Sequence, residues 1–349
     1  MMGEMNTGQN AAPRGRTVSA SAIISIVAGI AVLAAVLWKL GVAETWEQVR
    51  NVGWAFPAIV ALGGLRFLVR AGAWMICLEP PHQLRLRDAF AAVLAGDALG
   101  NATPLGPLVG EPAKAAFARR HVAGQPALTA LAVENIFYTL ATAAMIAAGT
   151  IALLFAFELP VEIRDFSRVA IVGMALLIAA SFIVLWKRPA LLSRWLPRGP
   201  SSGRTSKLRA LEQDVYSFAS RRPGALVPVA LLEVGFHVLG VVETHLTLWS
   251  ILGTPPLLLT SFIFETASRL VVVAFKIVPL QLGVAEATLA PFALLVGLEP
   301  RVGLAFSLVR KARIVVWAIT GAALLVRSGV GPRSDPSQTG VTPRPEPRP

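Results

Sequence analysis

Two uninterrupted apolar runs constrain the fold of this chain more than any other feature of its sequence. Residues 18–38 and 169–186 contain no charged side chain over 21 and 18 residues. About 20 apolar residues are needed for a helix to cross the hydrocarbon core of a bilayer, and helices satisfy their own backbone polar groups there. Both runs therefore predict membrane-spanning helices, in a chain that is 55% hydrophobic and only 15% charged.

Four further apolar stretches carry isolated charges and bring the number of predicted spans to six. They are residues 54–78, 126–157, 224–252 and 302–326. The first run, 18–38, is longer than the apolar core of a secretory signal peptide and ends without a small-residue cleavage site. It therefore predicts a retained span.

Two other apolar regions are broken near their middle by proline and glycine. Residues 89–117 contain NATPLGPLVGEP, and residues 256–298 contain KIVPLQLGVAEA. Such breaks are typical of re-entrant helical hairpins or discontinuous helices. The predicted fold class is an all-α polytopic membrane protein with about six full spans and two re-entrant hairpins. As an alternative, the arm 256–278 is long enough to cross the bilayer, which would give seven or eight spanning helices.

The distribution of charge predicts the orientation of the chain in the membrane. Residues 187–222 hold nine Lys/Arg against two acidic residues, which the positive-inside rule places in a cytoplasmic loop over 187–223. Loops 39–53 and 158–168, with net charges of zero and −1, suit the outside. Both termini are then cytoplasmic, and the hairpins enter from opposite sides. This topology accounts for most of the net charge of +12 without nucleic acid as a partner.

The two breaks also match each other along the chain. Pro104 precedes Glu111 by seven residues, and Pro279 precedes Glu286 by the same seven. The match extends to Glu134 and Arg310, at nearly equal offsets in the following spans. It predicts an inverted repeat of residues 18–157 and 169–326, flanked by a terminus over 1–17 and a disordered tail over 327–349. A chance match in an apolar sequence is the alternative.

Ionisable residues inside these segments are candidate functional residues, because a charge in hydrocarbon is costly unless it faces protein or a wet cavity. Glu111 and Lys114 lie just after the first break, and Glu286 lies just after the second. The helical arms that follow each break point their amide-bearing N-termini into the membrane, where they could bind an anionic headgroup. Alternatively, the two glutamates satisfy free backbone N–H groups at the breaks.

Arginines on two predicted spans form a second group of candidates. Arg66 and Arg70 share one helix face, and Arg310 and Arg313 share another. Guanidinium forks near the middle of the membrane suit phosphate or carboxylate recognition. The alternative is internal ion pairing with Glu134, Glu265 or Asp97. Glu265 and Arg269, four residues apart, predict a local ion pair.

The span 224–252 carries a polar stripe on one face. Its members are Glu233, His237, Gly240, Thr244 and Thr247. A glutamate and a histidine in such a stripe can relay protons, whereas hydrogen bonds between packed helices are the alternative. Two possible ligands without a third indicate no metal site, and Cys77, the single cysteine, excludes an internal disulfide. We expect neither a cofactor nor catalytic chemistry.

Two extended motifs resemble those of a known family. The segments GDALGNATPLGPLVGEPAKAAFARR, IVPLQLGVAEATLAPFALLVGLEP and LAFSLVRKAR are similar to the lysylphosphatidylglycerol synthase transmembrane-domain family over residues 18–327. The second motif is most similar to the hopanoid-locus subset of that family. The resemblance implies a lipid translocase or lipid-transport protein of the bacterial inner membrane. The soluble aminoacyltransferase domain of true synthases is not in this sequence, so we do not expect lipid aminoacylation.

The resemblance also implies roles for individual residues. The residues that match the family's hairpin breaks are Pro104, Gly106, Gly110, Pro279 and Gly283. Glu111, Lys114, Glu286 and Arg310 match its charged positions. Asn135 stands where the family commonly has an arginine, and the second motif is poorer in glycine than usual, which puts the identity of the substrate in doubt.

We therefore expect a flippase that moves a phospholipid or a polyprenoid lipid between leaflets. The expected substrate-binding residues are Arg66, Arg70, Glu111, Lys114, Glu134, Glu286, Arg310 and Arg313, and the expected proton relay is Glu233 and His237. Two alternatives are a membrane enzyme that modifies a lipid and a scaffold whose partners are lipid-biosynthesis enzymes.

Overall fold

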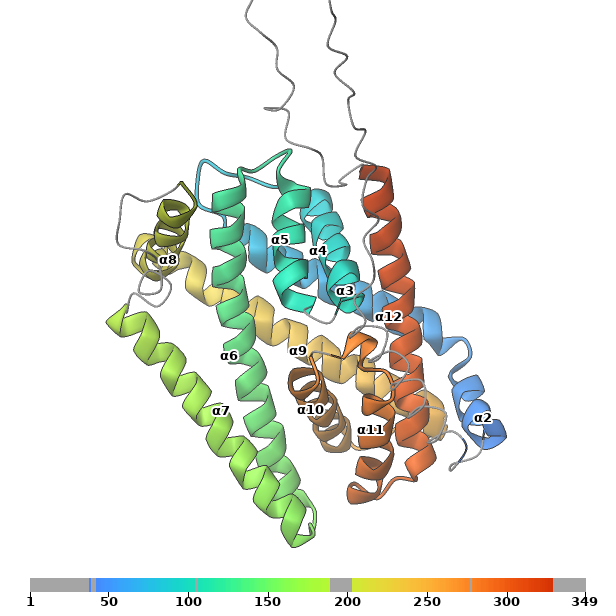
Figure 1. The fold of residues 1–349 in the computed structure, drawn as a ribbon. Helices are drawn as coiled ribbons and strands as arrows, with labels where there is room; N and C mark the ends of the chain where they lie inside the picture. The colour runs from blue at the N-terminus through green and yellow to red at the C-terminus, as the bar shows by residue number, and fades with distance from the viewer. Residues whose placement is uncertain (1–37, 39–41, 104–105, 189–202, 277, 329–349) are drawn as a thin grey trace, which may run out of the picture.

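The computed structural model describes residues 38, 42–103, 106–188, 203–276 and 278–328. Every regular element in this part of the chain is a helix (Figure 1), which confirms the predicted all-α class. The first predicted span, except for its last residue, lies outside the described residues, as do Pro104, most of the tail and residues 189–202 of the basic loop.

Five long helices correspond to five of the six predicted spans. They are α3 (Ala55–Cys77), α6 (Gly124–Ala156), α7 (Val161–Lys187), α9 (Pro223–Leu252) and α12 (Pro300–Ser328). The first four are long and apolar enough to cross a membrane. The fifth is 29 residues long, and its apolar run is interrupted by Arg310, Lys311 and Arg313.

The two broken regions form helical hairpins at opposite ends of the molecule. The first consists of α4 (Leu86–Asn101) and α5 (Gly106–Ala118), and the second of α10 (Leu258–Ala274), the 3₁₀ turn η2 (Pro279–Gln281) and α11 (Val284–Leu295). Figure 1 shows α4 and α5 in the upper half, α10 and α11 in the lower half, and both tips near the middle. A helix of 17 residues such as α10 spans only about 25 Å. The region 256–298 is therefore a hairpin and adds no full span.

Packing between the helices has the reciprocal pattern that an inverted repeat requires. The first hairpin packs on the last span of the second half, α4 on α12, and the second hairpin packs on the last span of the first half, α10 on α6. The contacts of α3 with α4 and α6 are likewise repeated by α9 with α10 and α12, while α3 and α9 pack on each other. Two short helices follow the same rule, because α2 (Val42–Val52) packs on α12 and α8 (Gly203–Arg221) on α6.

Small residues let the two arms of the first hairpin approach closely. A Cβ atom at Gly106 would lie 2.9 Å from the carbonyl oxygen of Gly100, and one at Gly110 would lie 2.8 Å from that of Gly96. Real Cβ atoms essentially never approach backbone oxygen so closely. The glycine spacing therefore fixes α4 against α5 and determines how far the hairpin reaches into the molecule.

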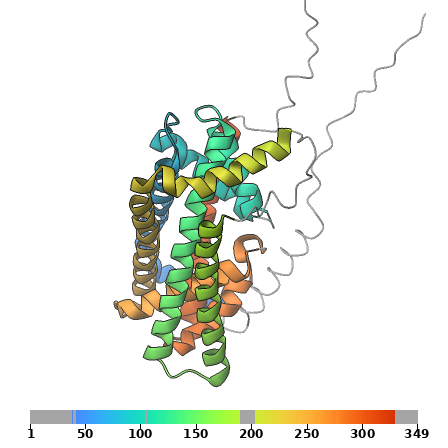
Figure 2. The ribbon, with the colours of Figure 1, turned by 90° about the vertical axis from the view of Figure 1, so that its left-hand side faces the viewer.

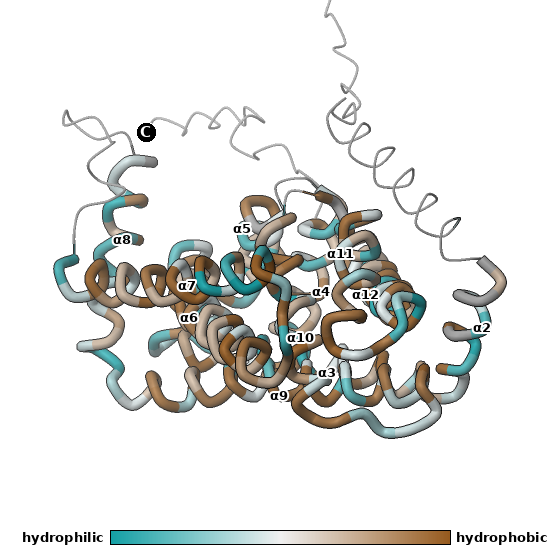
Figure 3. Tube along the Cα trace, turned by 90° about the horizontal axis from the view of Figure 1, so that it is seen from below, coloured by the Kyte–Doolittle hydropathy of each residue, from teal (hydrophilic) through white to brown (hydrophobic). Residues whose placement is uncertain are grey.

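The outer surface is apolar, as expected for contact with lipid. Helix α7 packs along α6 (Figure 2), and its apolar window has no buried residue. Its exposed side chains include Val169, Leu176 and Phe182. Figure 3 shows apolar colouring along the long helices, so the chain is a multi-pass membrane protein. Charged residues near the middle of its helices, such as Arg66, Glu243 and Glu265, are buried inside.

Candidate functional site

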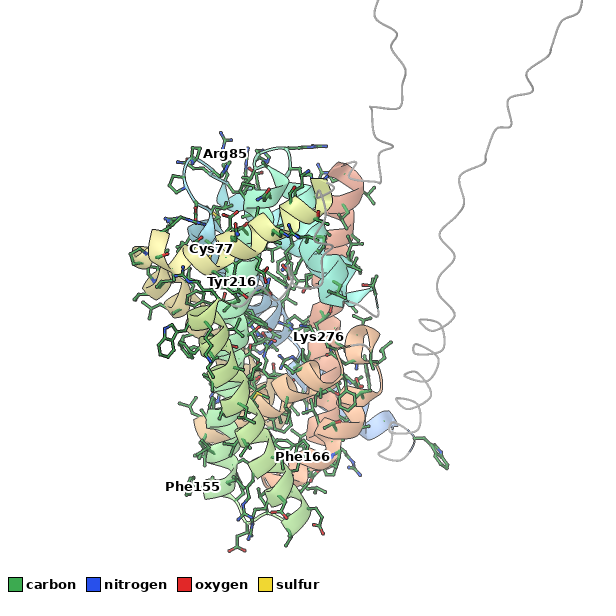
Figure 4. The ribbon with its side chains drawn as sticks, turned by 60° about the vertical axis from the view of Figure 1, so that its left-hand side comes forward. Cys77, Arg85, Phe155, Phe166, Tyr216 and Lys276 are labelled. Carbon is green, nitrogen blue, oxygen red and sulfur yellow. The ribbon has the colours of Figure 1, made fainter. Side chains whose placement is uncertain are left out.

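Two adjoining cavities lie between the tips of the hairpins. One has a volume of about 180 Å³ and the other about 170 Å³. Both are lined by Arg70, Asp97, Asn101 and Tyr138 from the first half and by Leu280 and Gln281 from the second. We call them together the central cavity. Lys276, which lines the smaller part, lies about midway between the two ends of the molecule (Figure 4).

Four of the five arginines that line the larger part share two glutamates. These residues, which we call the arginine cluster, are Arg66, Arg269, Arg310 and Arg313. Arg66 Nη1 and Arg313 Nη1 both donate to Glu243 Oε2, at 2.9 and 3.0 Å. Arg269 Nε donates to Glu265 Oε1 at 2.8 Å, which is the predicted local pair, and Arg310 Nη1 donates to Glu265 Oε2 at 2.5 Å. All six side chains are at least nine-tenths buried.

The arginine cluster holds more positive charge than its glutamates neutralise. Four guanidinium groups against two carboxylates leave a formal excess of two positive charges. The Nε atoms of Arg66 and Arg313 have no hydrogen-bond partner among the described residues. The ring of Phe236, 4.3 Å from Arg66 Cζ, offers partial compensation through a cation–π contact. Buried charge of this kind favours an anion in the cavity.

Two residues of helix α9, Gly240 and Glu243, bring the arginine cluster together. A Cβ atom at Gly240 would lie 2.6 Å from Glu265 Oε1 and 3.3 Å from Arg66 Cζ, so glycine makes room for both side chains. Glu243 is three residues further on and was not among the predicted site residues. Glu243 does not belong to the polar stripe of α9 but lies on the face of the helix that is directed toward α3 and α12.

Arg70 forms a separate, neutral pair. Its Nε and Nη2 atoms donate to Glu134 Oε1 and Oε2 at 2.7 and 2.9 Å, in a bidentate arrangement. The guanidinium also lies 4.3 Å from the centre of the Tyr138 ring. Glu134 is only 1% exposed and lies behind Arg70, outside the cavity lining. It is thus placed to hold the arginine.

Each motif glutamate pairs with a lysine. Glu111 accepts a hydrogen bond from Lys114 at 2.7 Å on the same helix, whereas Glu286 accepts one from Lys311 of α12. The Oε2 atom of each glutamate has no hydrogen-bond partner among the described residues. Among the described residues, which leave out 104 and 105 of the first break, the hydrogen bonds to these two glutamates come from ammonium groups.

The second break has an unusual backbone that α12 holds in place. Leu280 and Gln281 have φ angles of +52° and +46°, in the left-handed region that L-residues rarely adopt, and Gly283 follows at +76°. Lys311 Nζ donates to the carbonyl oxygen of Gln281 at 3.2 Å. The same ammonium therefore neutralises Glu286 and fixes a backbone segment that lines the cavity.

The helices that follow the breaks begin beside the cavity. Helix α5 starts at Gly106, which lines the smaller part, and Ala285 in the first turn of α11 lines the larger part. The positive ends of both helix dipoles thus add to the field of the arginines.

The polar stripe on α9 is buried but lies outside the cavity lining. Glu233 is fully buried, and neither of its carboxylate oxygens has a hydrogen-bond partner among the described residues. His237 Nε2 lies 3.2 Å from Thr142 Oγ1 of α6, which is a contact between packed helices. A proton relay through Glu233 and His237 stays a prediction. No group of three or more His, Cys, Asp or Glu able to hold a metal occurs in the described part of the chain.

The cavity brings together most of the predicted substrate-binding residues. Those that line it are Arg66, Arg70, Glu111, Lys114, Arg310 and Arg313. Among the predicted break residues, Gly106 and Gly110 line the smaller part. Among the lining residues that the prediction did not include are Arg269, Lys276, Gln281 and Lys311. Lys276 and Gln281 lie within three residues of Pro279, and Lys311 follows Arg310, so nearness to a predicted residue was the available signal for these three. Arg269 lies ten residues before Pro279 and was predicted only as the partner of Glu265.

A comparison with family models links this geometry to known proteins. The model described as "Lysylphosphatidylglycerol synthase TM region" matches residues 22–322. The matched range contains both hairpins, the whole arginine cluster and the lysines that pair with the motif glutamates. Searches of curated proteins and of solved structures gave no match.

Proposed function

Because the chain belongs to the lysylphosphatidylglycerol synthase transmembrane family, a family of lipid-related membrane domains, we propose that it moves an anionic lipid between the two leaflets of a membrane. The headgroup binds in the central cavity, and its negative charge is recognised by the arginine cluster. The observation that carries this proposal is the buried ratio of four arginines to two glutamates between hairpins that enter from opposite ends.

The excess charge selects the class of headgroup. A phosphate carries one or two negative charges and accepts bidentate hydrogen bonds from guanidinium groups. Phospholipids and polyprenyl phosphates both meet this requirement. An uncharged hopanoid does not, because it would leave the excess positive charge of the arginine cluster with only one carboxylate outside an ion pair, that of Asp97, as counter-ion among the described lining residues.

Headgroup binding at Arg66 couples to movement of one half of the protein against the other, because this arginine joins the two halves. Among the ion pairs of the membrane helices described here, those that join the first repeat to the second are Arg66 with Glu243, at 2.9 Å, and with Glu265, at 3.8 Å. A phosphate that binds Arg66 competes with these carboxylates. Binding then weakens the link between the repeats, as alternating access requires.

The membrane of action in this proposal is the bacterial inner membrane, with the end that carries α8 and the basic loop in the cytoplasm. Nine basic residues in that loop support this orientation. The hairpin α4–α5 then faces cytoplasmic substrate, and the hairpin α10–α11 faces the opposite leaflet.

Lipid movement by purified protein tests the proposal. The protein is reconstituted in phosphatidylcholine vesicles that contain tail-labelled fluorescent phosphatidylglycerol, and dithionite is added to bleach label in the outer leaflet. Wild-type protein should make the inner label accessible. Arg313→Gln should slow this by about ten- to hundredfold, the effect of losing one charged hydrogen bond, while Glu243 keeps its bond to Arg66.

A matched control comes from the same helix. Arg301 is exposed at the start of α12, so Arg301→Gln should leave the rate unchanged. Equal rates in wild type, Arg313→Gln and protein-free vesicles would refute the proposal. A covalently altered lipid in the vesicles would instead favour the lipid-modifying enzyme, and activity that needs added biosynthetic enzymes would favour the scaffold.

A further inference from the structure

Two apolar cavities lie against the α6–α7 pair, in addition to the central cavity. The first, of about 500 Å³, is bounded by α6, α7, α10 and α11 and is lined by side chains such as Leu153, Phe166 and Phe292. The second, of about 570 Å³, is bounded by α6, α7 and α8 and is lined by side chains such as Ile136 and Val184. We call them the α10 cavity and the α8 cavity.

The two cavities lie on one line along both helices. Lining residues recur 18 positions apart, which is five full turns of an α-helix: Asn135 and Leu153 on α6, and Phe166 and Val184 on α7. Figure 2 shows α6 and α7 side by side, with α8 crossing near one end. The same faces of the two helices therefore form a track with a cavity at each end.

The length of this track matches the membrane. Eighteen residues of helix rise about 27 Å, slightly less than the hydrocarbon thickness of about 30 Å. In Figure 4, Tyr216 of the α8 cavity and Phe166 of the α10 cavity lie toward opposite ends of the molecule. In a bilayer crossed by α6 and α7, one cavity would therefore lie at the depth of each leaflet.

Each apolar cavity adjoins the polar one. Asn135 lines both the α8 cavity and the smaller part of the central cavity, and Val271 lines both the α10 cavity and the larger part. Helix α10 separates polar from apolar, because Arg269 faces the central cavity and Leu270 faces the α10 cavity. A headgroup in the central cavity and a hydrocarbon tail in an adjoining apolar cavity are therefore close enough to belong to one lipid molecule.

We propose that the α6–α7 track holds a hydrocarbon tail of the transported lipid, in the α8 cavity in one leaflet and in the α10 cavity in the other. The inference rests on the proposed function, because the tail belongs to the lipid whose head binds the arginines. An apolar chain fits the lining, the depth and the contact with the headgroup cavity. The tail stays in an apolar environment while the head crosses between the hairpins.

Tryptophan substitutions on α7 test the track. Ala170 lines the α10 cavity and Ala180 lines the α8 cavity, so a tryptophan at either position fills space that the tail would occupy. Ala175, between them, is exposed and lines neither, which makes Ala175→Trp the matched control. Ala170→Trp and Ala180→Trp should each slow phosphatidylglycerol movement about tenfold or more, since each displaced methylene accounts for a factor of about four. Rates equal to the control would overturn the proposal.

Photolabelling of the wild-type protein keeps the test decisive if a variant fails to fold. Phosphatidylglycerol with a diazirine in one tail should label α7 at Ser167 and Val184, which line the two cavities, more than at Val172, which is exposed and lines neither. Arg313→Gln should lower the first labels and leave the last unchanged. Uniform labelling would refute the track even if the protein moves lipid. Labelling of the track by a protein that moves no lipid would refute the proposed function and leave the tail site standing.

Discussion

The pair of Arg70 and Glu134 allows structural and functional roles of a buried arginine to be separated. Arg70→Met removes both hydrogen bonds of a carboxylate that is 1% exposed. Breaking a buried ion pair from one side costs about 3–5 kcal/mol, because the remaining charge has no partner. We therefore expect the folding equilibrium constant of Arg70→Met to fall by about two to four powers of ten.

The double variant Arg70→Met/Glu134→Met should recover most of that loss. Replacing both partners of a buried pair with apolar side chains is often neutral or stabilising. The double variant should lie within about 1 kcal/mol of wild type, so that the coupling free energy between the two positions is at least about 5 kcal/mol when each single variant costs about 3–5 kcal/mol.

The assay is equilibrium unfolding in mixed micelles, with SDS as denaturant and circular dichroism as the signal. The four proteins of the cycle are compared with Arg313→Met, whose partner Glu243 retains Arg66. Arg313→Met should cost less than about 1 kcal/mol, because it lowers the excess of buried positive charge. A cost below about 1 kcal/mol for Arg70→Met, or a double variant as unstable as the sum of the singles, would refute the reasoning.

Two further predictions concern glycines at close contacts, each with a control glycine at which an added Cβ atom would meet nothing within 4 Å. Gly106→Ala should destabilise the protein by about 1–3 kcal/mol, because the new Cβ atom meets the Gly100 carbonyl oxygen at 2.9 Å. The control Gly173→Ala on α7 should leave the stability unchanged. Thermal unfolding in detergent measures both variants, and equal unfolding midpoints would contradict the packing argument. Gly240→Ala should displace Glu265 from the arginines and slow phosphatidylglycerol movement about tenfold, because one charged hydrogen bond is lost. The control Gly235→Ala should leave the rate unchanged. A Gly240→Ala protein with the wild-type rate would contradict this prediction and show that the arginine cluster tolerates rearrangement.

Much of the fold follows from local sequence because a bilayer allows few choices. Uncharged runs of sufficient length must be helices, and proline with glycine in the middle of an apolar region must interrupt one. The breaks at 104–110 and 279–283 therefore predicted the hairpins. The equal spacing from each proline to Glu111 or Glu286 predicted that the two hairpins belong to an inverted repeat. The reciprocal packing of α4 on α12 and of α10 on α6 supports this prediction.

The partners of the charged residues could not be predicted in the same way. Arg70 and Arg310 do pair with glutamates that were considered, Glu134 and Glu265. Arg66 pairs mainly with Glu243, which is 177 positions away and which no local pattern marks. A helix wheel selects one polar face, but α9 packs against α3, α6, α10 and α12, so more than one of its faces is buried.

The two motif glutamates show what the repeat preserves. Three residues after Glu111 stands Lys114, its ion-pair partner, but three residues after Glu286 stands Leu289, and the partner is Lys311 of α12. A comparison of the two halves residue by residue would therefore miss the second pair. The lysine comes from a different position in each half, but it neutralises the carboxylate at the break in both. The shared requirement is electrostatic, because a carboxylate buried at a break in the membrane must have a cation beside it, whichever helix supplies it.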